Sequence, residues 1–315
     1  MARMLPTGCF HVVLTLPSEL RGLARRNPRE LYDLLFHAGS DALMTLGRDP
    51  RRLGGLIGIT SVLHTWRRDQ AHHPHLHCIV PGGALTTTPE GDARWIDAGR
   101  DHLFPVKVVG KLFRGKYLAG LQRLLDKGAL DLPPELGAPS ARAALLAHLH
   151  RTRWVVHCKR PFAGAEQVYK YLGRYTHRVG LSNNRILHLD HDSVTISTRD
   201  GRTATMPPAE LLERFLQHVL PRGYVKIRHY GLHASGNLAT RLPAARAAIE
   251  ARHVEARGRP NRPPPSDWRD RLKALVGVDL RRCRACGGTR MERLVMCPPS
   301  SERSSRGPPD QEGPP

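Results

Sequence analysis

Two histidines separated by one residue are the most chemically suggestive feature of the sequence. His75 and His77 lie in the run HPHLHCIV (residues 73–80), whose apolar and β-branched residues predict a strand. Side chains on a strand alternate between its two faces, so both imidazoles are expected on one face, ~7 Å apart. Two imidazoles on a rigid sheet form half of a divalent-metal site. A solvated histidine-rich loop is the alternative, which the apolar residues in the run disfavour.

Two tyrosines form a second chemical group. Tyr171 and Tyr175 lie in a segment, residues 163–179, that predicts a helix, so they share one helical face. Gln167 lies one turn earlier, and Arg174 and Arg178 lie beside the tyrosines. An activated phenolic oxygen can attack a phosphodiester while arginine neutralises the phosphate. Tyrosines at this spacing also occur as ordinary core packing, but the arginines and the upstream histidines favour catalysis.

The elements that must position these residues alternate between strands and helices. Their β-α-β-β order is that of an α+β fold, a ferredoxin-like or RRM-like antiparallel sheet with helices on its faces and further helices as insertions. The histidine strand and the strand before it form a hairpin that supplies central strands. Residues 84–104 are expected to be irregular, and His72 and His73 to lie in the hairpin turn. Strands are expected at 9–16, 54–66, 75–80, 154–158, 185–198, 202–206 and 224–229, and the main helices at 28–46, 106–127, 163–179 and 207–219.

The charge of the chain favours a polyanionic partner. Its 315 residues include 49 Lys+Arg against 28 Asp+Glu, a formal net charge of +21, and nucleic acid is the usual partner of such a chain. Aromatic residues make up only 5%, so aromatic stacking on bases should not dominate binding. No secretory signal or long apolar span is found, which predicts no membrane association and a bacterial, cytoplasmic, nucleoid-associated protein.

Basic residues cluster around the tyrosine helix and the strands that flank it. A solvated basic face would explain them, but a groove for single-stranded DNA is favoured because the same elements carry the chemistry. Binding should then weaken as salt rises. The expected DNA contacts are Lys170, Arg174, Arg178, Arg185, Lys226 and Arg228.

Four runs of the sequence resemble the IS91-type rolling-circle transposases, which are HUH single-strand endonucleases. They are LHTW (63–66), HHPHLHCIVPGG (72–83), YLGRYTHRVGLSNNR (171–185) and KIRHYG (226–231), and the similarity extends from about residue 5 to about residue 294. The resemblance implies an HUH core that nicks and rejoins single-stranded DNA at transposon ends.

The resemblance also implies roles for individual residues. His75 and His77 would hold Mg²⁺ or Mn²⁺, which polarises the scissile phosphate. Tyr171 and Tyr175 would be the nucleophiles, leaving a 5′-phosphotyrosine and a free 3′-OH. The third metal ligand is His64, on the neighbouring strand of the hairpin, or Gln167, or water.

The two ends of the chain depart from the family pattern. Residues 1–254 are expected to form the catalytic domain, 255–297 a basic linker with a degenerate cysteine-containing segment, and 298–315 a disordered tail. Cys283 and Cys286 resemble half of a zinc ribbon, but a tetrahedral site needs four ligands and only Cys297 follows, so zinc is not expected there. The sequence also begins at the first predicted strand, without the N-terminal zinc-binding segment usual in the family, so a truncated or decayed copy is expected.

Two other functions fit the same residues. A plasmid replication initiator or a relaxase would use the same chemistry, although the sequence contains no P-loop motif of an attached helicase. A transposase remnant that binds DNA without cleaving it is the alternative outside the enzyme class. Formation of a covalent protein–DNA adduct separates the enzyme from the remnant.

Overall fold

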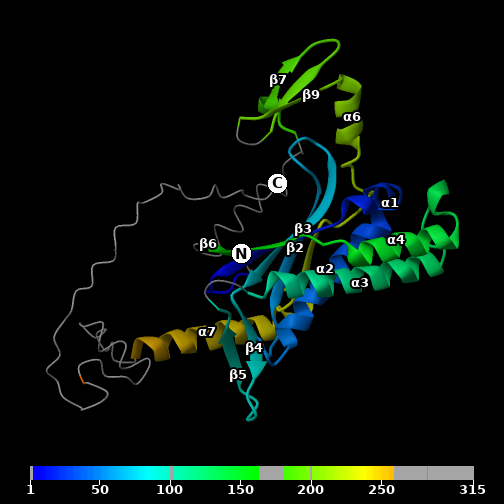
Figure 1. The fold of residues 1–315 in the computed structure, drawn as a ribbon. Coiled ribbons are helices and arrows are strands. Elements are labelled where there is room, and N and C mark those ends of the chain that lie inside the picture. The colour runs from blue at the N-terminus through cyan, green and yellow to red at the C-terminus, as the bar shows by residue number, and fades with distance from the viewer. Residues whose placement is uncertain (1–2, 100–102, 163–180, 199–200, 259–281, 283–315) are drawn as a thin grey trace. The chain divides into compact units, whose positions relative to one another are not determined.

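A computed structural model describes residues 3–99, 103–162, 181–198, 201–258 and 282 of the chain (Figure 1). The chain divides into two compact units, residues 1–253 and 254–315, and the fold described below is that of the first. The predicted tyrosine helix and the predicted C-terminal tail lie outside the described residues. None of the described helices is both long and apolar enough to cross a membrane.

A five-stranded sheet forms the centre of the first unit. Every neighbouring pair of strands is antiparallel. The histidine strand is the middle one, and its hairpin partner lies beside it, which confirms that the hairpin supplies central strands. The sheet order is β10 (Ile227–Gly231), β2 (Gly58–Trp66), β3 (His72–Pro81), β1 (Cys9–Thr15) and β6 (Val156–Phe162).

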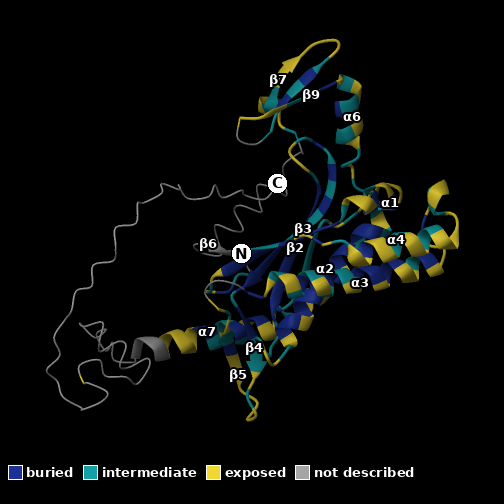
Figure 2. Cartoon of the chain, in the orientation of Figure 1, coloured by how far each residue is buried: buried dark blue, intermediate teal, exposed yellow. Residues whose placement is uncertain are grey.

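Helices cover one face of this sheet. Two helices of 21 residues, α2 (Pro28–Arg48) and α3 (Val106–Asp126), pack on each other, and α2 packs on β3. Leu14 of β1 and Leu76 of β3 are cross-strand partners, and both are completely buried in the same core cluster as the apolar side chains of these helices. Figure 2 colours the buried parts of the sheet and of these helices dark blue. The predicted mixed α+β class is therefore confirmed. One face of the sheet packs against the helices and forms the hydrophobic core.

A second hairpin contradicts the prediction that residues 84–104 are irregular. Residues Gly83–Thr87 (β4) and Ala93–Asp97 (β5) form a two-stranded antiparallel sheet. Trp95 is buried there against Leu242 and Ile249 of α7 (Arg241–Gly258), a helix that the sequence pattern did not predict. Most of β5 is exposed, so its sequence lacks the alternation that marks a strand.

A third sheet has a small core of its own. It contains β7 (Ile186–Leu189), β8 (Val194–Ser197) and β9 (Thr203–Met206), and α6 (Pro208–Leu216) packs on it through Leu211. The single strand predicted over 185–198 is interrupted because the Asp190 carboxylate accepts the backbone N–H groups of Asp192 and Ser193, which closes a turn. The remaining described elements are η1 (Ser18–Leu20), α1 (Arg21–Arg26), η2 (Pro134–Leu136), α4 (Pro139–Arg151), η3 (Asn183–Arg185) and η4 (Ser235–Asn237).

Gly231 ends β10 in a conformation that a side chain would disrupt. Its φ is +59°, and a Cβ atom there would lie 1.9 Å from the Ile57 carbonyl oxygen. We expect Gly231→Ala to lower the free energy of unfolding by about 2–4 kcal/mol, because left-handed strain adds to a backbone clash. Urea unfolding measures this change. Gly236→Ala is the control, since a Cβ at Gly236 meets nothing within 4 Å; equal effects of the two substitutions would contradict the argument.

Candidate metal centre

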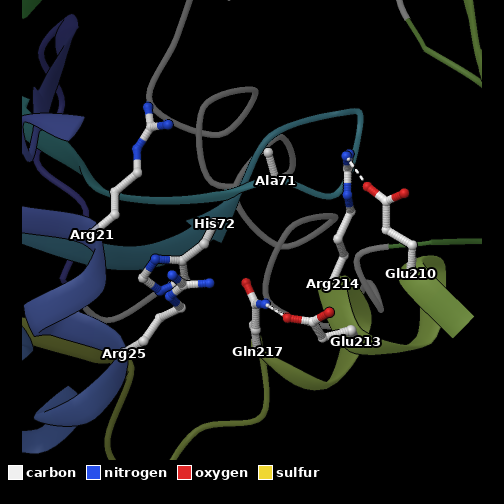
Figure 3. A pocket seen from close by; sticks show the side chains of 8 residues that line it. All are labelled: Arg21, Arg25, Ala71, His72, Glu210, Glu213, Arg214 and Gln217. Carbon is white, nitrogen blue, oxygen red and sulfur yellow. Dashed lines mark hydrogen bonds and ion pairs between the residues drawn. The ribbon is translucent and has the colours of Figure 1, made fainter. Parts of the chain in front are cut away.

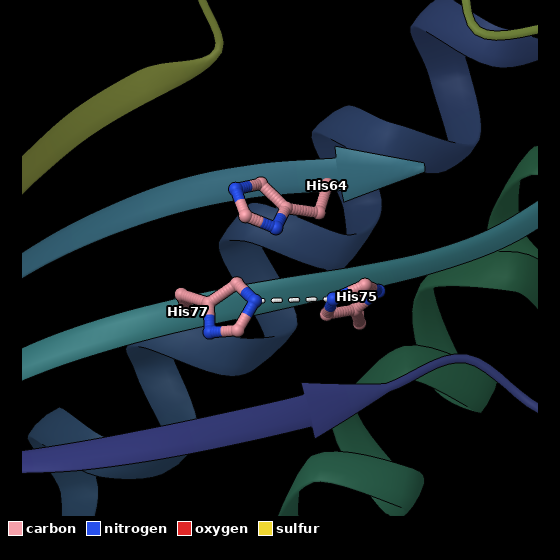
Figure 4. Close-up of side chains that lie close together, drawn as sticks. All are labelled: His64, His75 and His77. Atoms are coloured by element: carbon pink, nitrogen blue, oxygen red, sulfur yellow. Dashed lines mark hydrogen bonds between the residues drawn. The ribbon is translucent and has the colours of Figure 1, made fainter. Parts of the chain in front are cut away.

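The register of the central hairpin brings three histidines together. His64 of β2 pairs directly with His75 of β3, and His77 follows on the same face. Leu76, between them, faces the helices, so the imidazoles lie on the opposite face of the sheet, with the helices behind (Figure 4). One ligand nitrogen from each histidine lies within 4.8 Å of the other two. The structure thus groups all three histidines proposed from the sequence.

Hydrogen bonds at the outer nitrogens orient two of these rings. The His75 Nδ1 lies 2.6 Å from the His73 carbonyl oxygen, which can only accept, so Nδ1 donates and Nε2 presents its lone pair. The His77 Nδ1 lies 2.7 Å from the Nε2 of His11. Both Nδ1 atoms are therefore engaged outside the cluster, and both Nε2 atoms face into it. Metal-binding histidines are held in this way by outer partners.

The spacing of the inner nitrogens fits an ion between them. The Nε2 atoms of His75 and His77 are 3.1 Å apart. Imidazole nitrogen binds a divalent ion such as zinc at about 2.0–2.1 Å, which places two ligand nitrogens about 2.8–3.4 Å apart at octahedral or tetrahedral angles. The spacing of His75 and His77 is therefore compatible with a bound divalent cation, and His64 offers a ligand nitrogen within 4.8 Å of both.

His11 is an outer partner of this cluster that the sequence interpretation missed. It lies on β1, is buried, and its ring is nearly parallel to that of His77, with 13° between the ring planes and 4.9 Å between the centroids. The sequence did contain evidence for the orientation of His11, because alternation along β1 places its side chain on the face opposite the core residues Phe10 and Val12. Only the pairing of β1 with β3 shows that this face is the histidine face.

Burial favours the neutral form of two histidines of the cluster, His64 and His75. Burial lowers the pKa of His75 to about 4. The pKa of His64 is lowered well below its usual value by burial and by the nearby charges of His75 and Lys226. Neutral imidazole is the form that binds metal. His64 and His75 therefore present lone pairs, not protons, to an incoming cation.

Histidines buried in the neutral state should make the protein acid-sensitive. Burial is the main cause that lowers the pKa of His72 and His233 to about 3 and of His73 to about 4. In the unfolded chain these groups titrate near about 6.5. The unfolded state therefore binds more protons below that pH, and the free energy of unfolding should fall as the pH drops from about 7 towards 4.

Urea titrations at two pH values, about 7 and about 5.5, measure this loss of stability. His233 lies outside the metal cluster, and its Nδ1 bonds to Thr60 Oγ1 at 3.0 Å. We expect His233→Gln to reduce the difference in unfolding free energy between the two pH values. A wild-type protein with equal stability at both would refute the prediction.

The prediction that His72 and His73 lie in the hairpin turn is wrong, because β3 begins at His72, which pairs with Trp66. The His72 Nε2 is 2.8 Å from the Tyr32 hydroxyl, which anchors the start of the strand. Pro74 is tolerated because it lies where the ladder with β2 is irregular, while its carbonyl accepts the Leu16 N–H.

Three of the six expected DNA-binding residues are described. Lys226 is half-buried, and its charge acts on His64, so it lies at the histidine cluster. Arg228 is bonded to Asp33, with its guanidinium 4.4 Å from the Phe36 ring centroid, which indicates a packing role. Arg185 donates to the Ser197 carbonyl at 2.9 Å and holds the small sheet together. Their contacts with DNA stay predictions.

The remaining candidate residues lie outside the described part of the chain. They are Lys170, Tyr171, Arg174, Tyr175 and Arg178, the alternative ligand Gln167, and the cysteines Cys283, Cys286 and Cys297.

Comparison with known proteins adds a family relationship to this geometry. Residues 58–240, which include the three histidines and both tyrosines, match the family model Y2_Tnp, described as "Putative transposase". A protein of Sinorhizobium fredii named "Putative transposase y4qJ" is 40% identical over 294 residues, covering 90% of this chain and 72% of that protein. The "Transposase for insertion sequence element IS801" of Pseudomonas savastanoi pv. phaseolicola is 27% identical over 296 residues, covering 88% and 65%.

Proposed function

Because the chain belongs to the Y2_Tnp transposase family, which matches residues 58–240, we propose that it cleaves and rejoins single-stranded DNA at the ends of a mobile element. One observation carries the proposal. Three histidines on two paired strands bring their ligand nitrogens within 4.8 Å of one another, on the face of the sheet opposite α2 and α3. The transposase names of both relatives favour this function over a replication initiator or a relaxase.

His75 and His77 would hold the ion through Nε2, and His64 would supply the third ligand. A bound Mg²⁺ or Mn²⁺ would supply Lewis-acid polarisation of the scissile phosphate. Mg²⁺ prefers oxygen ligands, so a site with three imidazoles should bind Mn²⁺ more tightly. Lys226, whose charge acts on His64, would stabilise the negative charge of a phosphate at this face.

The nucleophile in this proposal is the hydroxyl of Tyr171 or Tyr175. Its oxygen attacks the phosphorus, the bond from phosphorus to the 3′-oxygen breaks, and that oxygen leaves as a 3′-hydroxyl after taking up a proton. The product is a 5′-phosphotyrosine. Attack of a 3′-hydroxyl on this ester reverses the step and rejoins the strand without ATP. The second tyrosine would let cleavage and strand transfer alternate without release of DNA.

His11 would act as a positioning residue for the ion. Its hydrogen bond to the Nδ1 of His77 holds that ring with Nε2 towards the cluster. We expect His11→Ala to weaken Mn²⁺ binding about 10–100-fold, the usual effect of removing an outer partner of a metal ligand. Calorimetric titration of the metal-free protein with Mn²⁺ measures this affinity, and unchanged binding would show that the ring of His77 needs no such support.

A covalent-adduct assay tests the proposed function. Labelled single-stranded oligonucleotides that tile the DNA flanking the gene are incubated with the protein and either Mn²⁺ or EDTA. With Mn²⁺ we expect an adduct that survives SDS and carries the label on one side of the cut, and with EDTA none. A mobility shift without an adduct under both conditions would identify a DNA-binding protein without nuclease activity.

A further inference from the structure

A polar pocket of about 310 Å³ lies where β3 begins, between α1 and α6 (Figure 3). Its volume is in the range of small-ligand sites. The Arg21 Nη2 on its wall lies 3.1 Å from the His73 Nδ1, and the His73 carbonyl accepts the hydrogen bond from His75. Two hydrogen bonds therefore connect the pocket wall to the metal cluster.

Two arginines give one side of this pocket a positive charge. Arg21 and Arg25 both line it, and neither forms an ion pair with a carboxylate among the described residues, although Asp69 and Glu19 act on Arg21 electrostatically. The Arg21 Nε is buried without a hydrogen-bond partner in the described part of the chain. Burial and the charge of Arg67 lower the pKa of Arg21. Among the described residues no carboxylate pairs directly with these two arginines, so this side of the pocket favours the binding of an anion.

His72 adds a buried donor to the same side. Burial raises the pKa of Tyr32, so its hydroxyl keeps its proton. That hydroxyl has one hydrogen-bond partner among the described residues, the His72 Nε2, and donation to this nitrogen is the arrangement that pairs the buried hydroxyl proton. The proton of the neutral His72 ring then lies on Nδ1, which is buried and has no described partner. Burial of an unpaired donor lowers the stability of the fold unless an acceptor forms a hydrogen bond with it.

The opposite side of the pocket differs in chemistry. The Glu213 carboxylate accepts a hydrogen bond from the Gln217 amide at 3.2 Å, and both side chains line the pocket. A carboxylate accepts from the amino group of a base, and an amide can both donate and accept. Arg214 pairs with Glu210 at 2.5 Å and donates to the Asp69 carbonyl at 2.9 Å, which ties α6 to the hairpin turn.

We propose that this pocket binds one nucleotide of the single-stranded DNA substrate. Its phosphate lies against Arg21, Arg25 and His72, and its base lies against Glu213 and Gln217. That the ligand is DNA rests on the proposed function. The cationic side of the pocket is complementary to the phosphate of a nucleotide, and the side with the amide and the carboxylate is complementary to its base.

Fluorescence anisotropy with labelled 20-nucleotide dA, dC and dT strands tests this inference. The titrations contain EDTA, so neither metal binding nor cleavage contributes. We expect Arg25→Ala to weaken binding about tenfold and to lower the slope of log K against log salt by about 0.7, the value for one phosphate contact on a single strand. Arg94→Ala removes the same charge from an exposed position on β5 and should leave the slope unchanged. Equal slopes for the two variants would overturn the proposal.

The proposed contact between the base and Glu213 is tested separately. Glu213→Gln should change the relative affinities for the three strands, and an unchanged ranking would overturn the assignment of the base. Binding of dCMP is measured in the same way. If Arg25→Ala weakens dCMP binding but leaves strand binding unchanged, the pocket is specific for free nucleotides, and this result would also overturn the proposal. Because these assays measure binding alone, a protein that forms no covalent adduct but shows the Arg25 effect would refute the nuclease and retain the pocket.

Discussion

Replacement of His75 or His77 by alanine should reduce metal-dependent nicking by at least about 10³-fold, because the loss of a ligand removes several kcal/mol of charge stabilisation at the phosphate. The two Nε2 atoms are 3.1 Å apart, so each variant leaves an incomplete donor set. Mn²⁺ affinity, measured by calorimetry, should fall in parallel. Binding of single-stranded DNA in EDTA should stay close to wild type, since the basic side chains remain.

The control for this experiment is His37→Ala, an exposed histidine on α2, the helix on the other side of the sheet. It should leave nicking and Mn²⁺ binding unchanged. Circular dichroism and a thermal melt of each variant establish that the fold is retained. Normal nicking by a well-folded His75→Ala or His77→Ala protein would refute the ligand assignment, and His64→Ala tests the third ligand in the same way.

The double substitution Tyr171→Phe with Tyr175→Phe should eliminate the covalent adduct, a loss of at least about 10³-fold, because phenylalanine keeps the ring and removes the attacking oxygen. DNA binding and Mn²⁺ affinity should persist. Tyr169→Phe is the matched control, since its position in the sequence does not share the helical face of the other two.

The single tyrosine variants separate one nucleophile from two. Under the proposed scheme each single variant loses complete strand transfer, and mass spectrometry of the peptide–nucleotide adduct identifies the tyrosine that still reacts. If one variant keeps full strand transfer, that tyrosine is not a nucleophile. An adduct that survives in the double variant would assign the attack to a different side chain.

The sequence by itself determined the features that depend on local periodicity. Alternation along a strand has a period of two, so His75 and His77 had to share one face and Leu76 the other, in whatever sheet the strand lay. The short connection between β2 and β3 similarly indicated His64 as a cross-strand partner of His75. The helices α2, α3 and α6 were found from apolar spacing at the helical period, to within a few residues at most of their ends.

Tertiary structure alone decided which distant segments meet. His11 joins His77 because β1 pairs with β3, and no local pattern states which of several strands will be neighbours. The hairpin of β4 and β5 is stabilised by the burial of Trp95 against α7. This long-range contact outweighs the weak strand pattern in the sequence of β5. The polar pocket combines α1, the start of β3 and α6, so its cavity and its unpartnered donors exist only in the folded chain. Local preferences are properties of adjacent residues, whereas packing between distant elements depends on their three-dimensional arrangement.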